Sequence, residues 1–168
     1  MTNENNTLDA VLRIGEVIEV SGRKIFVRVE KNKNLSDLFY SGELIRNVSV
    51  NGYVEIRKGF LRLIGKVEGE RVEEAQYDAQ NAASVFDRNK RTLTIALVGF
   101  VNKKGIFFGG TRELPLIGNE AFLVTLKRIQ QIHSLSSGES ATVNFASTES
   151  DDYPIEFPVD GLFNSHIA

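Results

Sequence analysis

The chain of 168 residues contains no cysteine, which excludes disulfide bonds, thiolate nucleophiles and every cysteine-ligated zinc site. Its only two histidines, His133 and His166, have no second nitrogen ligand or carboxylate at metal-binding spacing. We therefore expect no metal site. The sequence also lacks G-x-G-x-x-G and G-x-x-x-x-G-K-[ST], so we expect no phosphate-binding loop and no nucleotide cofactor in this chain.

Long apolar runs are missing as well. No stretch approaches the roughly 18 residues that a membrane span needs, and Met1–Asn6 lacks the basic and apolar regions of a signal peptide. Together with the absence of cysteine, this predicts a cytoplasmic protein with no membrane partner. Twenty basic and 22 acidic residues give a net charge of -2, which argues against a free-standing binder that depends on neutralising phosphates.

The groups that could carry catalysis have simpler explanations. Asp160, Ser165 and His166 are the residue types of a hydrolase triad, but no G-x-S-x-G elbow surrounds the serine. Solvation of a strand end explains four neighbouring glutamates, because catalytic carboxylates need a concave and partly desolvated setting; these are Glu68, Glu70, Glu73 and Glu74. We expect no catalytic residue.

Apolar and polar side chains alternate in several short runs, a period-two pattern that is typical of β-strands with one buried face. In the run 24–30, the apolar residues Ile25, Val27 and Val29 alternate with Lys24, Phe26, Arg28 and Glu30. Ser21-Gly22 supplies a turn before this run. The pattern predicts two hairpins, which pair residues 11–20 with 24–30 and 53–57 with 61–67. Residues 92–101 are β-branched and apolar on both faces, which predicts a strand deep in the sheet, and the turn at 102–105 pairs it with 106–108 as a third hairpin. Two further strands are predicted at 141–146 and 154–159.

One helix is predicted after residue 125. Thr125 is a suitable N-cap, and Leu126, Ile129, Ile132 and His133 fall on one face at helical spacing. Between the second and third hairpins, charged, Gln, Asn and Ala residues dominate 70–91, which predicts an inserted polar loop or helix. The expected fold class is mainly β, a small closed or nearly closed β-barrel, because short hairpins follow one another at regular turn signals.

The chain is long enough for one domain with a sizeable core. We expect a flexible N-terminus at 1–10 and a barrel domain at 11–157 that contains the insertion at 70–91. Basic residues that could contact DNA or a partner occur at a strand turn, Arg57 and Lys58, and at a hairpin tip, Lys103 and Lys104. Solubilising turn residues are the plainer explanation, because the neighbouring phenylalanines are typical of a core or an interface; these are Phe60, Phe107 and Phe108.

Three runs in the first half of the chain resemble the N-terminal barrel of HerA-family ATPases, the HAS-barrel. They are I-G-E-V-I-E-V-S-G-R-K-I-F-V from Ile14, G-E-L-I-R-N-V-S-V-N-G-Y-V from Gly42 and K-G-F-L-R-L-I-G-K-V-E-G-E from Lys58. Later, T-R-E-L-P-L-I-G-N-E-A-F-L from Thr111 resembles the segment that precedes a helix in that family. P-I-E-F-P-V-D-G-L-F-N-S-H-I-A from Pro154 resembles the stretch that leads into its P-loop.

This resemblance implies that residues 158–168 begin an ATPase domain, whose P-loop, ATP and Mg²⁺ would belong to sequence beyond Ala168. The parent would be a hexameric, DNA-translocating motor or helicase that passes double-stranded DNA through its ring. Its barrels would help assembly and dock an effector protein. The insertion at 70–91 and the run Leu114–Glu120 resemble bacterial antiviral-defence members more than archaeal repair members, which implies a nuclease or a sirtuin-like NADase as effector.

The expected function is therefore a non-catalytic assembly and docking domain, in which edge strands of neighbouring barrels pair within a ring. A free-standing nucleic-acid-binding module of the OB type is the alternative, motivated by the short strands and by Lys103-Lys104. At the level of fold, the barrel also resembles the N-terminal crown of rotary ATP synthase subunits, which joins subunits and does no chemistry.

Overall fold

The computed structural model describes residues 10–30, 33, 37–40, 43–74, 89–125, 128–129, 132, 142–147 and 154–159. The chain forms two compact units, Met1–Val124 and Thr125–Ala168. Most of the predicted flexible N-terminus, both histidines, the hydrolase-like set at 160–166 and the proposed start of an ATPase domain beyond Val159 lie outside the described residues.

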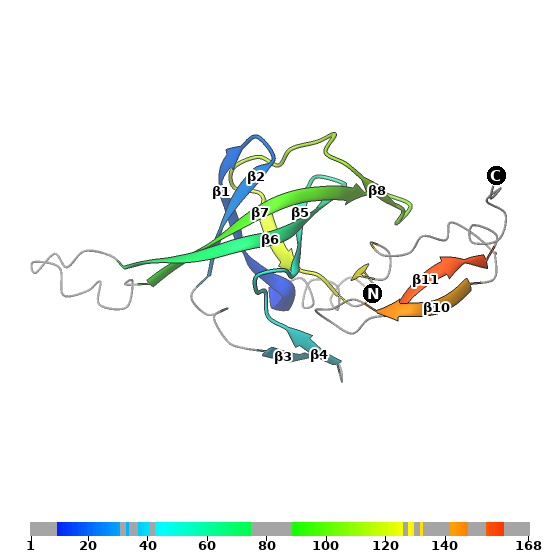
Figure 1. Ribbon diagram of the computed structural model, residues 1–168. Helices are drawn as coiled ribbons and strands as arrows, with labels where there is room; N and C mark the ends of the chain where they lie inside the picture. The colour runs from blue at the N-terminus through cyan, green and yellow to red at the C-terminus, as the bar shows by residue number, and fades with distance from the viewer. Residues whose placement is uncertain are drawn as a thin grey trace, which may run out of the picture. The chain divides into compact units, whose positions relative to one another are not determined.

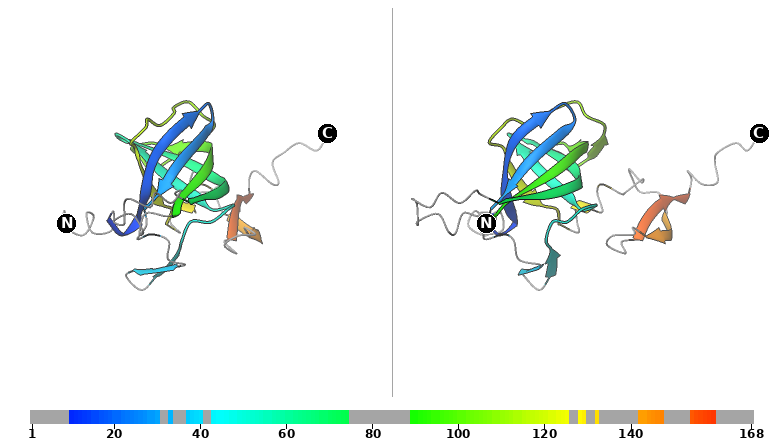
Figure 2. Two further views of the ribbon diagram at one scale, coloured as in Figure 1. Left: turned by 90° about the vertical axis from the view of Figure 1, so that its left-hand side faces the viewer. Right: turned by 60° about the vertical axis from the view of Figure 1, so that its left-hand side comes forward.

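Six antiparallel strands of the first unit close into a barrel in the order β2-β1-β9-β5-β6-β7, and β7 pairs back with β2. Figure 2 shows these strands wrapping around a common axis. Their bounds are β1 Arg13–Ser21, β2 Lys24–Val29, β5 Tyr53–Lys58, β6 Leu61–Glu74, β7 Asn89–Val101 and β9 Glu120–Leu123. The predicted mainly β fold and the closed barrel are confirmed.

The three predicted hairpins are also confirmed. β1 turns into β2 through Gly22, and β5 turns into β6 through Gly59; both glycines have positive φ angles, 60° and 57°, which residues with a Cβ rarely adopt. β7 turns into β8, Phe107–Gly109, which pairs with the last three residues of β7. The first strand begins at Arg13 and not at Val11, because Ala10–Leu12 is helical.

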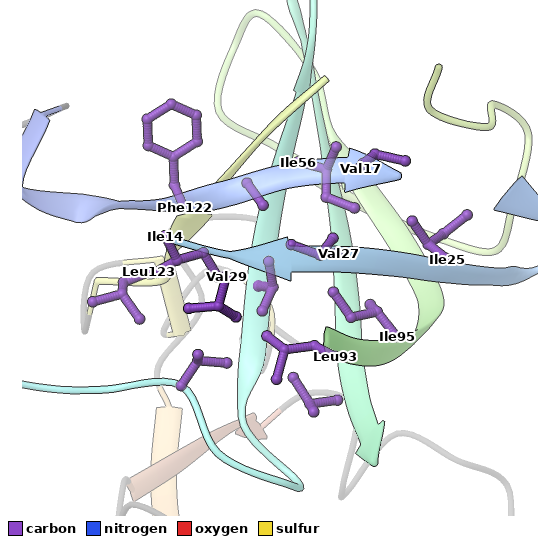
Figure 3. Close-up of a cluster of buried hydrophobic side chains, with 14 of the residues drawn as sticks. Ile14, Val17, Ile25, Val27, Val29, Ile56, Leu93, Ile95, Phe122 and Leu123 are labelled. Carbon is purple, nitrogen blue, oxygen red and sulfur yellow. The ribbon is translucent and has the colours of Figure 1, made fainter. Parts of the chain in front are cut away.

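The core is filled by the inward-facing side chains of the alternating strands. Figure 3 shows Ile14, Val27, Ile56 and Ile95 gathered from four different strands, and each has a fully buried side chain. Burying a side chain of this size contributes about 1.5–3 kcal/mol. The period-two pattern predicts this core because it states which residues of each strand share a face.

The closing strand, β9, has no alternating pattern. Ala121, Phe122 and Leu123 are all buried, and Ala121 and Leu123 pair with the inward-facing residues Ile56 and Val54 of β5. Phe122 points to the other face, away from the cluster in Figure 3, where the guanidinium of Arg57 covers its ring at 3.8 Å. The strand is therefore buried on both faces, and a period-two search does not detect such strands.

The insertion predicted at 70–91 is wrong at both of its boundaries. β6 continues to Glu74 and β7 begins at Asn89, and the ladder between them runs from Glu70 opposite Leu93 to Glu74 opposite Asn89. This two-stranded ribbon extends beyond the rest of the barrel (Figure 1). Leu93 and Thr92 are buried where the ribbon leaves the barrel. Beyond them its residues are polar apart from the exposed Val72, because no core lies beneath it, so the alternation disappears while the strands continue. Residues 75–88 lie outside the described part.

Closure of the barrel changes which strand edges can pair with a neighbour. Each of the six barrel strands has a hydrogen-bonded neighbour on both sides, so the predicted pairing of barrel edges within a ring has few free edges to use. In the described part, unpaired edges occur on β8, on the ribbon beyond Gly69 and on the two-stranded sheets β3–β4 and β10–β11. Backbone pairing with a neighbour is limited to these edges, whereas the wall of the barrel offers side chains.

The remaining elements are short. β3, Asp37–Tyr40, pairs with β4, Glu43–Arg46, and Leu38 and Ile45 pack against the barrel core. In the second unit, β10, Thr142–Ser147, pairs with β11, Pro154–Pro158, close to the predicted strands. Helical structure begins after Thr125 as predicted, since the N–H groups of Arg128 and Ile129 donate to the carbonyl of Thr125.

Candidate functional site

Exposed apolar side chains concentrate at one end of the barrel, in β8 and in the three connections beside it. Of the ten large apolar side chains that are exposed in the described part of the chain, six lie here. We call this group the loop-end surface: Phe60 in the β5–β6 turn, Ile106 in the β7–β8 turn, Phe108 in β8, and Leu114, Leu116 and Ile117 in the β8–β9 loop. Phe60 and Ile117 are the most exposed, at 77% and 71%.

Hydrogen bonds hold two of these connections in fixed shapes. In the β7–β8 turn, the side-chain oxygen of Asn102 accepts bonds from the N–H groups of Lys104 and Ile106, at 2.9 and 3.1 Å. In the β8–β9 loop, the side-chain oxygen of Asn119 accepts from Leu116 N–H at 2.9 Å, and Gly118 N–H donates to β1 at 2.8 Å. The apolar side chains are thus presented by ordered turns, which lowers the entropy cost of binding.

Two lysines connect the parts of the loop-end surface. The ammonium of Lys103 lies 4.1 Å from the centre of the Phe60 ring, a cation–π contact between the β5–β6 and β7–β8 turns. Lys58 Nζ donates to Glu113 at 2.8 Å and to the carbonyl of Leu114 at 2.9 Å, which ties the end of β5 to the β8–β9 loop. Contacts between distant sequence positions therefore bring these connections together.

Aromatic packing holds β8 in place at this end of the barrel. The rings of Phe100 and Phe108 stack with centroids 5.4 Å apart, and Phe100 packs against the core. Gly99 leaves room for Phe107, since a Cβ added at Gly99 would lie 2.5 Å from that ring. The position of Phe108 on the surface thus depends on a close approach between β7 and β8.

The structure gives the four predicted contact residues different surroundings. Arg57 and Lys58 are half-buried and held within the fold, Arg57 against Phe122 and Glu55, and Lys58 by Glu113. Lys103 and Lys104 are exposed at the β7–β8 turn, and Lys103 lies over Phe60. Lys58, Lys103 and Lys104 therefore lie at the loop end, whereas Arg57 belongs to the barrel wall.

A buried carboxylate on the barrel wall explains the position of Arg57. The side chain of Glu55 is 7% exposed and accepts bonds from Arg62 Nη1 at 2.8 Å and from Arg57 Nε at 3.4 Å. A carboxylate removed from water needs such partners. Because Arg57 also covers the ring of Phe122, this cluster serves to close the outer wall over β5 and β9.

Replacing Glu55 with alanine is expected to lower the free energy of unfolding by about 2 kcal/mol, because two arginines lose a buried partner. The loss is smaller than for a fully buried pair, since Arg62 is 43% exposed and water screens its charge. Urea unfolding measures the change. The matched control is Glu73→Ala, which removes the exposed Arg71–Glu73 pair and should cost about 0.5 kcal/mol or less; equal losses in both variants would contradict the structural role of Glu55.

The neighbouring glutamates of the ribbon are also engaged. Glu70 accepts from Arg91 Nη2 at 2.6 Å, and Arg91 donates to the carbonyl of Val48 at 2.8 Å. Glu73 pairs with Arg71 at 3.1 Å. Within the described ranges, no group of three or more His, Asp or Glu side chains is placed to hold a metal ion, and no described helix is long and apolar enough to cross a membrane.

The sequence indicates only part of the loop-end surface. Phe60 and Phe108 are predicted to be core or interface residues, and both are exposed. The place of Phe60 directly after the Lys58-Gly59 turn is the local signal of its exposure. The run Leu114-Pro115-Leu116-Ile117 has the composition of a buried segment, yet within it only Pro115 is buried. No model of a known protein family matches the sequence, and no curated protein matches it.

Proposed function

We propose that this chain is the non-catalytic assembly and docking domain of a HerA-like, ATP-driven DNA translocase, and that the loop-end surface binds a protein partner. The observation that carries the docking role is the group of six exposed apolar side chains on hydrogen-bonded turns. Monomeric proteins rarely keep large apolar side chains together in water, whereas the centres of protein interfaces are rich in them.

The resemblance of the sequence runs supports the more specific parts of the proposal. These parts are the HerA-like ATPase, a hexameric ring around double-stranded DNA, and a nuclease or sirtuin-like NADase as effector in antiviral defence. The closed barrel agrees with the fold that the resemblance implies, but a barrel of this kind can host many unrelated functions. The surface supports assembly and docking, and the sequence runs support the proposed identity of the parent.

A nucleic-acid-binding role of the OB type would need basic side chains free to meet phosphates and aromatic faces free to stack on bases. Phe60 and Lys104 have the exposure for this role. However, Lys103 already covers one face of the Phe60 ring, which leaves less aromatic surface for bases, and Lys58 is paired with Glu113. Four of the six side chains of the loop-end surface are aliphatic, which favours a protein partner over a nucleic acid.

The docking role is tested by removing the most exposed apolar side chains. We expect copies of the chain to associate head to tail, with the loop-end surface of one copy against a different face of the next. The mass of the unchanged chain, measured by sedimentation velocity, should therefore rise with protein concentration. In a Phe60→Ser, Ile117→Ser variant, association should weaken at least about tenfold, because central apolar contacts carry most interface energy.

The matched control is Leu44→Ser with Val72→Ser, which removes two exposed apolar side chains outside the loop-end surface. This control should associate like the unchanged chain. A chain that stays monomeric at every concentration would remove the self-assembly part of the proposal. Equal weakening in both variants would show that the loop-end surface has no special role.

A further inference from the structure

Basic residues surround the apolar side chains of the loop-end surface. The connections β1–β2, β5–β6, β7–β8 and β8–β9 contain four basic residues and one acidic residue, so their net charge is +3 in a chain whose total is -2. The basic residues are Arg23, Lys103, Lys104 and Arg112, and the acidic one is Glu113. One end of the barrel is therefore positive although the whole chain is slightly negative.

Little of this positive charge is neutralised within the fold. Glu113 is already paired with Lys58, which lies in β5. In the part of the chain that the structure describes, none of the four basic residues has a carboxylate at ion-pair distance; Lys103 contacts only the ring of Phe60. These charges are available to a partner.

We propose that the loop-end surface binds an acidic protein segment in which apolar side chains are interleaved with carboxylates, an inference that rests on the proposed docking function. The apolar side chains of the segment would pack on Phe60, Leu116 and Ile117. Its carboxylates would meet Lys103, Lys104 and Arg112 around them. Charge complementarity of this kind fixes the register of a complex and speeds encounter.

Two other occupants fit the surface less well. A second loop-end surface would bring like charges together, which costs several kcal/mol at an interface. Phe108 and Leu114 are only 44% and 38% exposed, and a partner that follows the shape of the surface can contact them more fully than a flat anionic membrane.

The probe for this inference is a synthetic amphipathic peptide whose apolar residues are leucine and phenylalanine and whose polar residues are all glutamate. Its matched peptide has glutamine at every glutamate position. Fluorescence anisotropy against the full chain should show the glutamate peptide binding at least about tenfold more tightly at low salt. High salt should remove most of this preference, because exposed charges are screened.

Charge reversal tests whether the basic residues of the loop-end surface bind the carboxylates of the peptide. In the full chain, Lys103→Glu, Lys104→Glu and Arg112→Glu together should lower affinity for the glutamate peptide at least about tenfold and leave the glutamine peptide nearly unaffected. The control reverses three basic residues elsewhere on the barrel, Arg28→Glu, Lys66→Glu and Lys90→Glu, with the same change in net charge. It should retain most of the preference.

The remaining outcomes separate a failure of the acidic preference from a failure of the docking function. Equal binding of both peptides, lost in Phe60→Ser with Ile117→Ser, would keep the docking function and overturn the acidic preference. Binding of neither peptide would count against both. Binding to phosphatidylserine–phosphatidylcholine vesicles without binding to the glutamate peptide would replace the protein segment with a lipid surface.

Discussion

Replacing Gly15 with alanine is expected to lower the free energy of unfolding by about 3 kcal/mol or more. A Cβ added at this position would lie 1.8 Å from the carbonyl oxygen of Arg28 and 3.1 Å from the Cα of Val29. Both are backbone atoms of β2, so the clash cannot be relieved by rotating a side chain. Gly15 also pairs with Ala121 of β9, and a shift of β1 would therefore disturb two ladders of the barrel at once.

Urea unfolding followed by far-UV circular dichroism measures this loss as a lower midpoint at an unchanged slope. The matched control is Gly69→Ala in β6, where an added Cβ meets no atom within 4 Å. The control should be as stable as the unchanged protein or slightly more stable, because alanine restricts the unfolded chain. Similar losses at both positions would mean that the close approach of β1 and β2 is not what requires glycine at 15.

The second large effect is expected at Gly99, where alanine should displace β8 from β7. An added Cβ would lie 2.3 Å from the carbonyl oxygen of Phe108 and 2.5 Å from the ring of Phe107. β8 is three residues long and pairs only with the last residues of β7, so β8 should move while the six barrel strands stay paired. We expect a loss of about 2 kcal/mol, with most of the change confined to the loop end.

Hydrogen exchange distinguishes this local change from general unfolding. In Gly99→Ala, amides of β8 should lose protection while those of β2 and β5 keep it, and association through the loop-end surface should weaken together with β8. The control is Gly109→Ala, in β8 itself, where an added Cβ has no neighbour within 4 Å. Loss of protection throughout the barrel, or undiminished association after β8 has moved, would contradict this account.

These two glycines connect the fold to the proposed function. Gly15 lets β1 lie close to β2 and so stabilises the barrel that carries every connection. Gly99 lets β8 lie close to β7, which places Phe108 beside Phe100 and fixes one side of the loop-end surface. In both cases the small residue serves a close approach between strands and not a turn.

How well the sequence predicted each element depends on whether one face of that element is buried. β1, β2 and β5 contribute one face to the core, and their alternation is visible in the sequence. β7 also buries alternate residues, but its sequence is apolar on both faces, so the sequence does not show which face is covered. β9 is buried on both faces and the ribbon end of β6 and β7 on neither, so alternation is absent and these segments were missed or assigned to an insertion. The sequence shows which residues are basic, but it does not show which side chains they contact in the fold.

The sequence by itself determined the hairpins, the mainly β class and the start of helical structure after Thr125, because alternation, turn glycines and helix caps act over a few neighbouring residues. Only the tertiary structure decided that β9 closes the barrel, that Arg57 and Lys58 are held within the fold, and that six apolar side chains remain outside it. These features depend on contacts such as Lys58 with Glu113, which are 55 positions apart. A local pattern predicts which residues share a face of a strand. Whether that face is buried depends on packing by segments that are distant in the sequence.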